Sequence, residues 1–413
     1  PLRDVSAGRR STLHIFAPDM NAYPTASTPR LWVFNPGHEE ALSFSREKRY
    51  TLSKEIRWMR HELSPLLRLL ASGEDLIYAP ASPEGIPARL LNAEGDDLPA
   101  GCDLPAELSV VLWGLDDHIV RELRECPLFD STTLLFPPIT PSYLRLSHRR
   151  ASYDLLAYLT DQLGYPSDLL PRWIKAGVDK SDTELRLRAA IEGIKSRPLG
   201  DPTRVLIKRP YSSSGRGVFP LPLPLQEKHL EALIGSCTRS GSVSIEPYLE
   251  VVDNWALEYT RSESGEVSFF ALSHFDTLPS GRAYLGNILT SPEDLWERLT
   301  SLMSEEALLT LINAQCTWLE EELSDSQYTG YIGIDLFFYR DGESLRLHPC
   351  VEINLRTTMG VLAHFAYEQY VPDGRKGVFR LERGPRQQPS QSIIPLLLTS
   401  SEAHFSAYIE LEK

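Results

Sequence analysis

Two polar sequences stand at the ends of neighbouring apolar segments in the last third of the chain, and their side chains could bind a metal ion. Asp335 follows the apolar residues 331–334, and the next apolar segment ends in three alternating polar residues, Glu352, Asn354 and Arg356. Alternate side chains of a β-strand share a face, so these three point the same way, and Asp335 can join them from the neighbouring strand. Carboxylate and amide oxygens suit Mg²⁺, which often binds through one or two carboxylates and nucleotide phosphates. Arg356 suits phosphate oxygens.

A hairpin at a sheet edge, with a solvated polar face, would produce the same short pattern. The flanking residues favour a buried site instead, because Asp335 stands alone among the apolar and aromatic residues 331–339. Glu352 likewise lies at the end of an apolar segment. Buried charges are rare unless they are paired or bind a metal. The sequence therefore predicts that Asp335, Glu352 and Asn354 are metal ligands.

A lysine followed by a loop of small residues lies upstream and could bind phosphate. Residues 205–210 predict a strand that carries Lys208, and the candidate loop residues after it are Ser212, Ser213, Ser214, Gly215 and Gly217. Small residues allow the backbone N–H groups to surround an anion closely. The loop is not a Walker loop, because no Gly-Lys-Ser/Thr sequence ends it and a strand follows. A plain hairpin turn explains the loop equally well.

Between these two regions lies a crossover that joins two predicted strands. The first strand ends at Glu246, and the irregular residues Tyr248 and Leu249 follow it. Their backbone could contact the edge of a base, and Asp253 could accept hydrogen bonds from ribose hydroxyls, as acidic residues do in other nucleotide sites. A strand, a turn and a strand without any ligand is the alternative.

The order of these segments resembles that of the ATP-grasp superfamily. The likeness covers residues 146 to 362 and is carried by the set of motifs, since each motif alone is weak. It implies an α/β and α+β chain in which a Rossmann-like domain precedes two lobes that clamp ATP. It also implies a carboxylate–amine or carboxylate–thiol ligase that works through an acyl-phosphate. ATP and Mg²⁺, expected as two ions, are the implied cofactors.

The resemblance also implies a role for each candidate residue. The nucleotide contacts would be Lys208 at the α- and β-phosphates, the loop 212–217 over the phosphates, Glu246, Tyr248 and Leu249 at the adenine, and Asp253 at the ribose. The magnesium ligands would be Asp335, Glu352 and Asn354, with Arg356 beside the transferred phosphoryl group.

The chain departs from the family pattern at two places. Many members carry a lysine at the start of the first helix of this region, where this chain has Arg149 and Arg150, either of which could replace it. Some ligases place an arginine two residues before the first metal aspartate, where this chain has Gly333. Another cationic side chain must then stabilise the acyl-phosphate, and the candidates are Arg282 and Arg356.

Length and spacing predict several domains, since 413 residues are many for one core. Residues 1–30 are rich in Pro, Ser and Thr and predict a loose extension. Residues 31–145 alternate buried strands with helical spacing, which predicts parallel βαβ units. Residues 146–250 would form the first ATP-grasp lobe, and residues 251–413 would form the second, which carries the metal site.

The turn after the first predicted strand could touch the second substrate. Ligands of open α/β sheets bind beyond the carboxyl ends of the strands, where this chain has Asn35, His38 and Glu39. A polar turn that caps the next element is the alternative.

Composition limits the partners. A net charge of −14 argues against non-specific binding to nucleic acid, although a cleft could still concentrate positive charge around ATP. The five cysteines are odd in number and lack a CxxC pair, which argues against a disulfide framework or a zinc site. No stretch reaches the ~18 to 20 apolar residues of a membrane helix. We therefore expect a cytoplasmic protein, with a homodimer as the commonest assembly. The resemblance implies small carboxylates and amines as its substrates.

Two other functions are compatible with the same motifs. One is an ATP-dependent small-molecule kinase, and the other is a nucleotide-binding protein of this fold without turnover. The set of Asp335, Glu352 and Asn354 argues against lost turnover, whereas the absence of an arginine before Asp335 favours it. The sequence does not identify the acid or the amine, because pocket loops set specificity.

Overall fold

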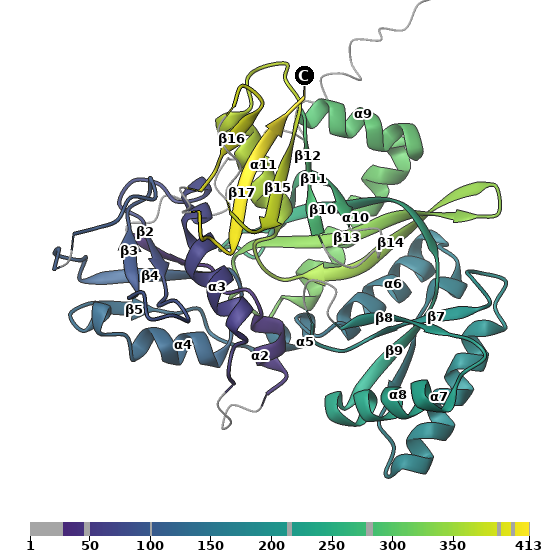
Figure 1. Ribbon diagram of the computed structural model, residues 1–413. Coiled ribbons are helices and arrows are strands. Elements are labelled where there is room, and N and C mark those ends of the chain that lie inside the picture. The colour runs from purple at the N-terminus through teal and green to yellow at the C-terminus, as the bar shows by residue number, and fades with distance from the viewer. Residues whose placement is uncertain are drawn as a thin grey trace, which may run out of the picture.

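The computed structural model describes residues 28–44, 50–99, 101–212, 217–277, 284–385, 390–397 and 401–412. The strands of this part form a five-stranded sheet (β3-β2-β1-β4-β5), a four-stranded sheet (β6-β9-β7-β8) and an eight-stranded sheet (β14-β13-β10-β11-β12-β15-β17-β16). Figure 1 shows the first in purple and blue, the second in teal at the lower right, and the third in green and yellow. The predicted mixed α/β class is confirmed.

The five-stranded sheet is mostly parallel. Its strands are β1 (Arg30–Val33), β2 (Leu76–Ala79), β3 (Arg89–Leu91), β4 (Glu107–Leu112) and β5 (Thr133–Leu135). Strand β1 pairs in parallel with both β2 and β4, whereas β3 is an antiparallel edge strand. The helices of this region are α2 (His38–Leu42), α3 (Lys54–Leu63) and α4 (Asp117–Arg124), with 3-10 turns at Ser64–Leu69 and Pro127–Phe129. Because β1 lies between β2 and β4, the turns after β1 and β4 meet at the carboxyl edge, where such sheets bind ligands.

The four-stranded sheet is antiparallel and carries helices on one face. Its strands are β6 (Arg172–Lys175), β7 (Arg204–Lys208), β8 (Val218–Pro222) and β9 (Ser242–Pro247). Helices α7 (Lys180–Lys195) and α8 (Glu227–Ser240) share a core with Val205 and Ile207 of β7. Lys208 alternates with Ile207, so it faces away from these helices. Helices α5 (Pro141–Leu146) and α6 (Arg150–Leu163) and a 3-10 turn at Ser167–Leu169 precede the sheet.

The eight-stranded sheet is covered by different helices on its two faces. Its strands are β10 (Glu250–Arg261), β11 (Val267–Thr277), β12 (Tyr284–Leu289), β13 (Gly330–Asp341), β14 (Ser344–Asn354), β15 (Gly377–Arg383), β16 (Ile393–Pro395) and β17 (Phe405–Leu411). One face, with Trp255, Leu257 and Ile334, packs on α6, α9 (Pro292–Leu302) and α10 (Glu305–Glu322). The other face carries Asp335 and is covered in part by α11 (Met359–Tyr370).

Polar capping residues set where the helices begin. Asp179 accepts a hydrogen bond from the backbone of Asp182 at the start of α7, and Ser304 does the same for Ala307 in α10. Such caps satisfy N–H groups that have no partner inside the helix. The cap at Ser304 also separates the two successive helices α9 and α10.

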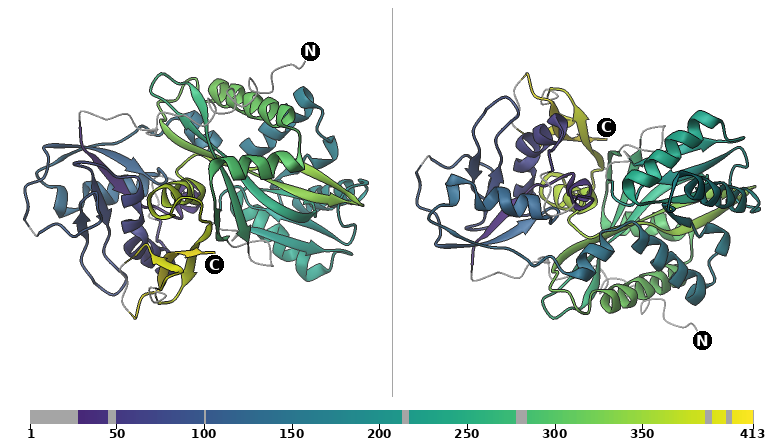
Figure 2. Two further views of the ribbon diagram at one scale, coloured as in Figure 1. Left: turned by 90° about the horizontal axis from the view of Figure 1, so that it is seen from above. Right: turned by 90° about the horizontal axis from the view of Figure 1, so that it is seen from below.

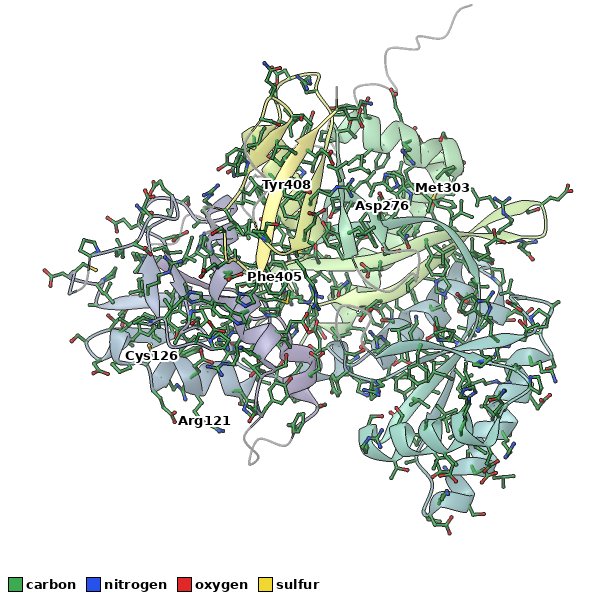
Figure 3. All side chains as sticks on the ribbon, in the orientation of Figure 1. Arg121, Cys126, Asp276, Met303, Phe405 and Tyr408 are labelled. Atoms are coloured by element: carbon green, nitrogen blue, oxygen red, sulfur yellow. The ribbon has the colours of Figure 1, made fainter. Side chains whose placement is uncertain are left out.

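The C-terminal strands β15 and β17 extend the large sheet and join it to the N-terminal region. Phe405 of β17 shares a core with Trp58 of α3. The ring of Trp58 also stacks on His404, with 4.0 Å between ring centroids. Figure 2 shows the purple N-terminal helices against the yellow strands from above and below, and Figure 3 labels Phe405 and Tyr408 on β17.

The five cysteines are all free thiols, two of them buried. Among the helices of the described ranges, none combines the length and apolar character needed to cross a membrane.

Candidate functional site

The predicted metal ligands lie together on one face of β13 and β14. Asp335 is directly opposite Glu352, and Gly333 is opposite Asn354, so the three polar side chains share a face. Asn354 Nδ2 donates to Asp335 Oδ1 at 3.1 Å, and Arg356 Nη2 donates to Asn354 Oδ1 at 3.0 Å. The structure therefore brings together the four residues of the predicted metal site: Asp335, Glu352, Asn354 and Arg356.

Two opposed carboxylates bring like charges next to each other at this point. Burial, together with the charge of Glu352, raises the pKa of Asp335 to about 7. Like charges directly opposite each other on neighbouring strands are destabilising, so a divalent cation here would stabilise the pair. The described residues contain no cluster of three or more His, Cys, Asp and Glu side chains able to hold a metal. Magnesium would therefore depend on two carboxylates, an amide and phosphate oxygens, which is an ordinary set for this ion.

Arg149 connects the large sheet to the phosphate-loop region. Its guanidinium donates to Glu352 Oε1 at 2.6 Å and to Ser212 Oγ at 2.8 Å, and it also contacts two backbone carbonyls. The side chain is buried, whereas Arg150 forms a surface ion pair within α6. Of the two arginines that could replace the family's first lysine, Arg149 is the one that lies in the site.

Lys208 faces this region from the four-stranded sheet. Its Nζ lies 2.8 Å from Glu246 Oε2, and Ser244 donates to the other oxygen of Glu246 at 2.8 Å. All three side chains are buried. Burial is the main cause that lowers the pKa of His348 to about 3, and the ammonium of Lys208 adds to it. The same ammonium acts across the gap between the sheets on Asp335, whose raised pKa it partly offsets.

Only the ends of the predicted phosphate loop belong to the described residues. The predicted site residues outside the described ranges are Ser213, Ser214, Gly215 and Arg282. The two ends touch, because a Cβ added at Gly217 would lie 2.1 Å from Ser212 Oγ. The backbone N–H of Arg209 donates to the carbonyl of Gly217 at 2.9 Å, which closes the hairpin. Glycine at position 217 is therefore required for the close approach of the loop ends.

Tyr248 and Leu249 form the crossover between the small and large sheets. The carbonyl of Tyr248 accepts a hydrogen bond from the backbone of Asp201 at 2.8 Å, and its ring lies 4.2 Å from the guanidinium of Arg204. Leu249 packs against the core of the large sheet. The predicted crossover is present, and one of its carbonyls already has a partner.

Asp253 lies on the opposite face of the large sheet from Asp335. Asp253 pairs with Phe338 in register, and both lie on the side that packs on the helices. Its carboxylate lies 2.6 Å from His274 Nε2 and accepts from Trp255 Nε1 at 3.0 Å. The structure thus does not bring Asp253 to the other candidate residues. The face depends on the register between β10 and β13, which the sequence of β10 does not determine.

Glu258 is a buried carboxylate that the sequence interpretation did not single out. It lies on the same sheet face as Asp335, opposite Gly333 in register. Thr358 Oγ1 donates to its Oε1 at 2.8 Å, while its Oε2 has no hydrogen-bond partner among the described residues. Burial raises the pKa of Glu258 to about 8. The available signal was a single acidic residue inside the apolar segment 255–259.

Glu258→Gln should stabilise the protein more at pH 8 than at pH 5. The folded state keeps a proton on Glu258 that the unfolded chain loses, so wild-type stability falls as the pH rises from 4.5 towards 8. Glutamine has no such proton, so this loss disappears. The effect is roughly 5 kcal/mol at most, and we expect a gain of several degrees in Tm at pH 8. Thermal melts at both pH values measure it, and an equal change in Tm at both would contradict the buried acid.

The turn after β1 reaches the same site from the N-terminal sheet. Arg356 Nε donates to Glu39 Oε1 at 2.9 Å, and His38 Nδ1 lies 3.1 Å from Glu39 Oε2. Asn35 Nδ2 donates to the carbonyl of Gly114 at 2.8 Å, which joins the turns after β1 and β4. Burial alone would raise the pKa of Glu39, but the charges of His38 and Arg356 outweigh burial and lower this pKa to about 2. Glu39 is therefore an ionised partner that holds Arg356 in place.

A small hollow lies where the three sheets approach each other. Residues from all three regions line it: His38, Glu39, Ser147, Arg149, Pro210, Ser212 and Glu352–Arg356. It places two guanidinium groups beside the carboxylates of the large sheet. Such an arrangement can hold an anionic group against a metal site.

No family model matches the chain, and no curated protein matches it. Several solved structures do match the chain. N5-carboxyaminoimidazole synthetase from Staphylococcus aureus is 13% identical, with 74% of this chain and 76% of that chain covered and a TM-score of 0.42. Biotin carboxylase from Campylobacter jejuni is 10% identical, with 74% and 71% covered and a TM-score of 0.44.

A third structure covers almost the whole chain. It is a protein from Archaeoglobus fulgidus whose description places it in the ATP-grasp superfamily, with 11% identity, 94% of this chain and 100% of that chain covered, and a TM-score of 0.40. At TM-scores below 0.5 the likeness assigns no function, so the function is inferred from the site itself.

Proposed function

We propose that the chain is an ATP-dependent ligase of the ATP-grasp type, which activates a substrate carboxylate as an acyl-phosphate and joins it to an amine. One observation carries the proposal. Cationic groups from separate elements, Lys208 and Arg149, face the opposed carboxylates Asp335 and Glu352 across the gap between the small and large sheets. A triphosphate with its counter-ion has the charge pattern that this arrangement complements.

Mg²⁺ would be held by Asp335 and Glu352, with Asn354 beside them. Burial and then the charge of Glu352 raise the pKa of Asp335, and this supports the assignment, since a bound cation would favour the ionised carboxylate. When bound, Mg²⁺ supplies charge neutralisation for the β- and γ-phosphates of ATP. Two ions are proposed, following the resemblance of the motifs. The present partners of Glu352 and Asn354 are Arg149 and Arg356.

The nucleotide would lie between the small and large sheets. Lys208 would contact the phosphates, together with the loop that begins at Ser212. The adenine would meet the crossover at Tyr248 and Leu249. Lys208 supports this placement, because its buried ammonium, now paired with Glu246, lies on the face that looks away from the helices.

Arg356 would stabilise the charge that develops during transfer. An oxygen of the substrate carboxylate attacks the γ-phosphorus, the bond to the β–γ bridging oxygen breaks, and ADP leaves. The amine nitrogen then attacks the acyl carbon, loses a proton, and releases phosphate. The residues act mainly by positioning and by charge stabilisation. The pair with Glu39 orients the guanidinium of Arg356 for this role.

Trapping with hydroxylamine tests the proposal. The protein is incubated with Mg·ATP, pooled carboxylic acids and hydroxylamine, and the products are measured by mass spectrometry. A ligase of this type forms an acid-dependent hydroxamate and releases ADP. Phosphorylation of a hydroxyl compound without hydroxamate would indicate a kinase, and ATP binding without phosphate release would indicate a non-catalytic protein. Either result would overturn the proposal.

Asp253→Asn should leave the affinity for ATP within about twofold of wild type. Asp253 pairs with the buried His274 on the helix-covered face, so its loss should instead lower stability by about 1–3 kcal/mol. Titration of ATP by intrinsic fluorescence and a thermal melt measure the two effects. A tenfold loss of ATP affinity with an unchanged melt would show that Asp253 contacts the nucleotide after all.

A further inference from the structure

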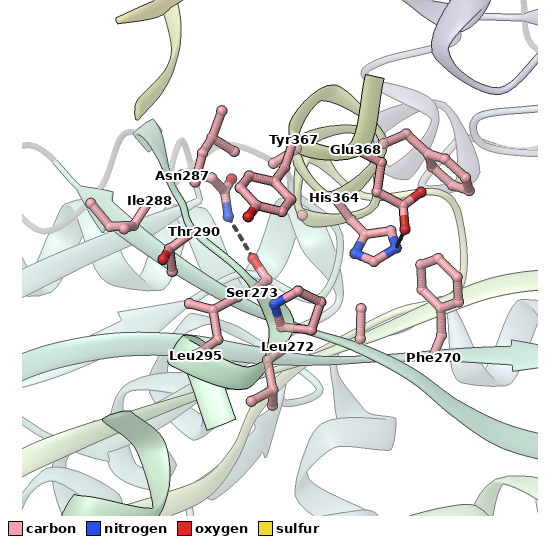
Figure 4. A pocket seen from close by; sticks show the side chains of 16 residues that line it. Phe270, Leu272, Ser273, Asn287, Ile288, Thr290, Leu295, His364, Tyr367 and Glu368 are labelled. Carbon is pink, nitrogen blue, oxygen red and sulfur yellow. Dashed lines mark hydrogen bonds and ion pairs between the residues drawn. The ribbon is translucent and has the colours of Figure 1, made fainter. Parts of the chain in front are cut away.

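A second cavity, of about 260 Å³, lies on the large sheet away from the hollow that holds Arg149. Strands β11 and β12 and helices α9 and α11 enclose it, as Figure 4 shows. Its size is slightly below the usual range of pockets for drug-sized ligands, roughly 300–1,000 Å³. It can therefore hold a molecule about as large as an amino acid.

The lining of this cavity is apolar on one side and polar on another. Its larger apolar side chains are Phe270, Leu272, Ile288, Leu289, Leu295 and Phe365. Asn287 Nδ2 donates to Ser273 Oγ at 2.6 Å on the sheet side, and Figure 4 shows these two side chains pointing toward each other. The hydroxyl of Tyr284 already donates to Asn287 Oδ1.

The charges around the cavity favour a cation over an anion. Glu368 is the one carboxylate among its described lining residues, and its Oε1 lies 3.2 Å from His364 Nε2. No lysine or arginine belongs to that described lining. A ligand carboxylate would therefore lose its hydration without gaining a strong cationic partner. An amine would find oxygen acceptors instead.

The cavity is connected to the metal ligands by a row of polar side chains. A Cβ added at Gly360, which lines the cavity, would lie 2.2 Å from Glu258 Oε1 and 2.5 Å from Ser273 Oγ. Glycine thus allows Glu258 and Ser273 to approach each other. The pairing register places five polar residues on a single sheet face from β12 to β14: Asn287, Ser273, Glu258, Asp335 and Glu352. Asp335 and Glu352 are directly opposite each other, and the other neighbours are offset diagonally by two residues.

Glu258 has a further acceptor to offer. Its side chain is almost fully buried at 1% exposure, and its Oε2 has no hydrogen-bond partner among the described residues. Buried polar atoms without partners are rare and call for an explanation. The unpaired Oε2 lies toward Gly333, where an added Cβ would come within 2.8 Å, whereas Oε1 lies toward Gly360 and Ser273. A ligand N–H group on the cavity side would therefore add a second hydrogen bond to Oε1, which now accepts from Thr358.

We propose that this cavity binds the amine substrate, as a small primary amine with an apolar body whose nitrogen points toward Ser273 and Glu258. The inference rests on the proposed ligase function and names the class of its second substrate. The apolar body would pack on Leu272, Ile288 and Leu295. The row of polar side chains leads from that nitrogen to the carboxylates at which the acyl-phosphate would form.

Binding to the full chain without ATP tests the cavity independently of catalysis. The probes are benzylamine, benzoate and toluene, measured by calorimetry or ligand-observed NMR. Benzylamine should bind at least tenfold more tightly than benzoate and toluene. Equal or tighter binding of benzoate would refute the preference for an amine. Tighter binding of toluene would refute a polar contact between the ligand nitrogen and the cavity.

Ala363→Leu should weaken benzylamine binding at least tenfold by filling the cavity. Ala232→Leu makes the same substitution at an exposed position of α8 and should change nothing. Ser273→Ala removes a polar contact with little change in volume, and it should weaken benzylamine binding about threefold to tenfold. This second variant still tests the site if Ala363→Leu does not fold. Unchanged binding in both cavity variants would refute the site.

Turnover separates this inference from the ligase proposal. Hydroxylamine is much smaller than the proposed amine, so Ala363→Leu should raise the KM for the amine substrate while leaving hydroxamate formation near the wild-type rate. Normal hydroxamate formation with an unchanged amine KM would refute the cavity and keep the ligase. Benzylamine binding without hydroxamate from any acid would refute the substrate role and the ligase together.

Discussion

Lys208→Ala should weaken the binding of Mg·ATP by about a hundredfold or more. The ammonium is buried and offers a charge-assisted contact to a phosphate, worth about 1.5–3 kcal/mol. Its removal also leaves Glu246, now 2.8 Å from Lys208 Nζ, as an unpaired buried carboxylate. That negative charge would repel the phosphates, which adds to the loss. Isothermal titration calorimetry with Mg·ATP measures the effect.

Two further variants separate a lost contact from a damaged fold. Lys175→Ala removes an exposed lysine from β6 of the same sheet and should leave ATP affinity unchanged. Lys208→Ala combined with Glu246→Gln removes the unpaired charge, so it should recover thermal stability but only part of the affinity. ATP affinity equal to wild type in Lys208→Ala would exclude the lysine from the nucleotide site.

Glu352→Ala should reduce turnover by about a thousandfold, whereas ATP affinity falls much less. The carboxylate stands directly opposite Asp335, so its loss removes half of the charge that would hold Mg²⁺ against the phosphates. A thousandfold loss corresponds to about 4 kcal/mol of transition-state stabilisation. Steady-state release of phosphate, measured over a range of Mg²⁺ concentrations, tests this expectation. An unchanged rate would refute the metal role.

The partner of Glu352 requires a second substitution at the same position. Arg149 lies 2.6 Å from its Oε1, so alanine would leave a buried guanidinium without that partner. Glu352→Gln keeps a hydrogen-bond acceptor for Arg149 but removes the charge, and turnover should still be lost. Glu343→Ala, at the exposed tip of the hairpin between β13 and β14, is the matched control. Full activity in Glu352→Gln would assign the residue to Arg149 rather than to a metal.

Local sequence determined those parts of the molecule that depend on neighbouring residues. Strand alternation has a period of two, so Glu352, Asn354 and Arg356 were predicted to point the same way, and hydrogen bonds now join Asn354 to both Asp335 and Arg356. Helix α7 likewise begins at a capping aspartate and buries apolar residues at helical spacing, and both are local signals. The mixed α/β class follows from the same local patterns.

The tertiary structure alone decided which distant residues meet. Glu39 and Arg356 are 317 positions apart, and the sequence around either residue does not predict its contact with the other. The same holds for the choice of Arg149 over Arg150, because both follow the same turn and only the packing of α6 on β14 separates them.

Asp253 and Glu258 show most clearly what the sequence alone could not predict. Both are acidic residues of one strand, and the pairing register of β10 with β13 sends Asp253 to the helix-covered face and Glu258 to the face that carries Asp335. A shift of one residue would exchange these two faces, and the energy that prevents it comes from burying Trp255 and Leu257 against distant helices. Sequence thus determined which side chains alternate, whereas the packing of the whole sheet determined which of them face the candidate site.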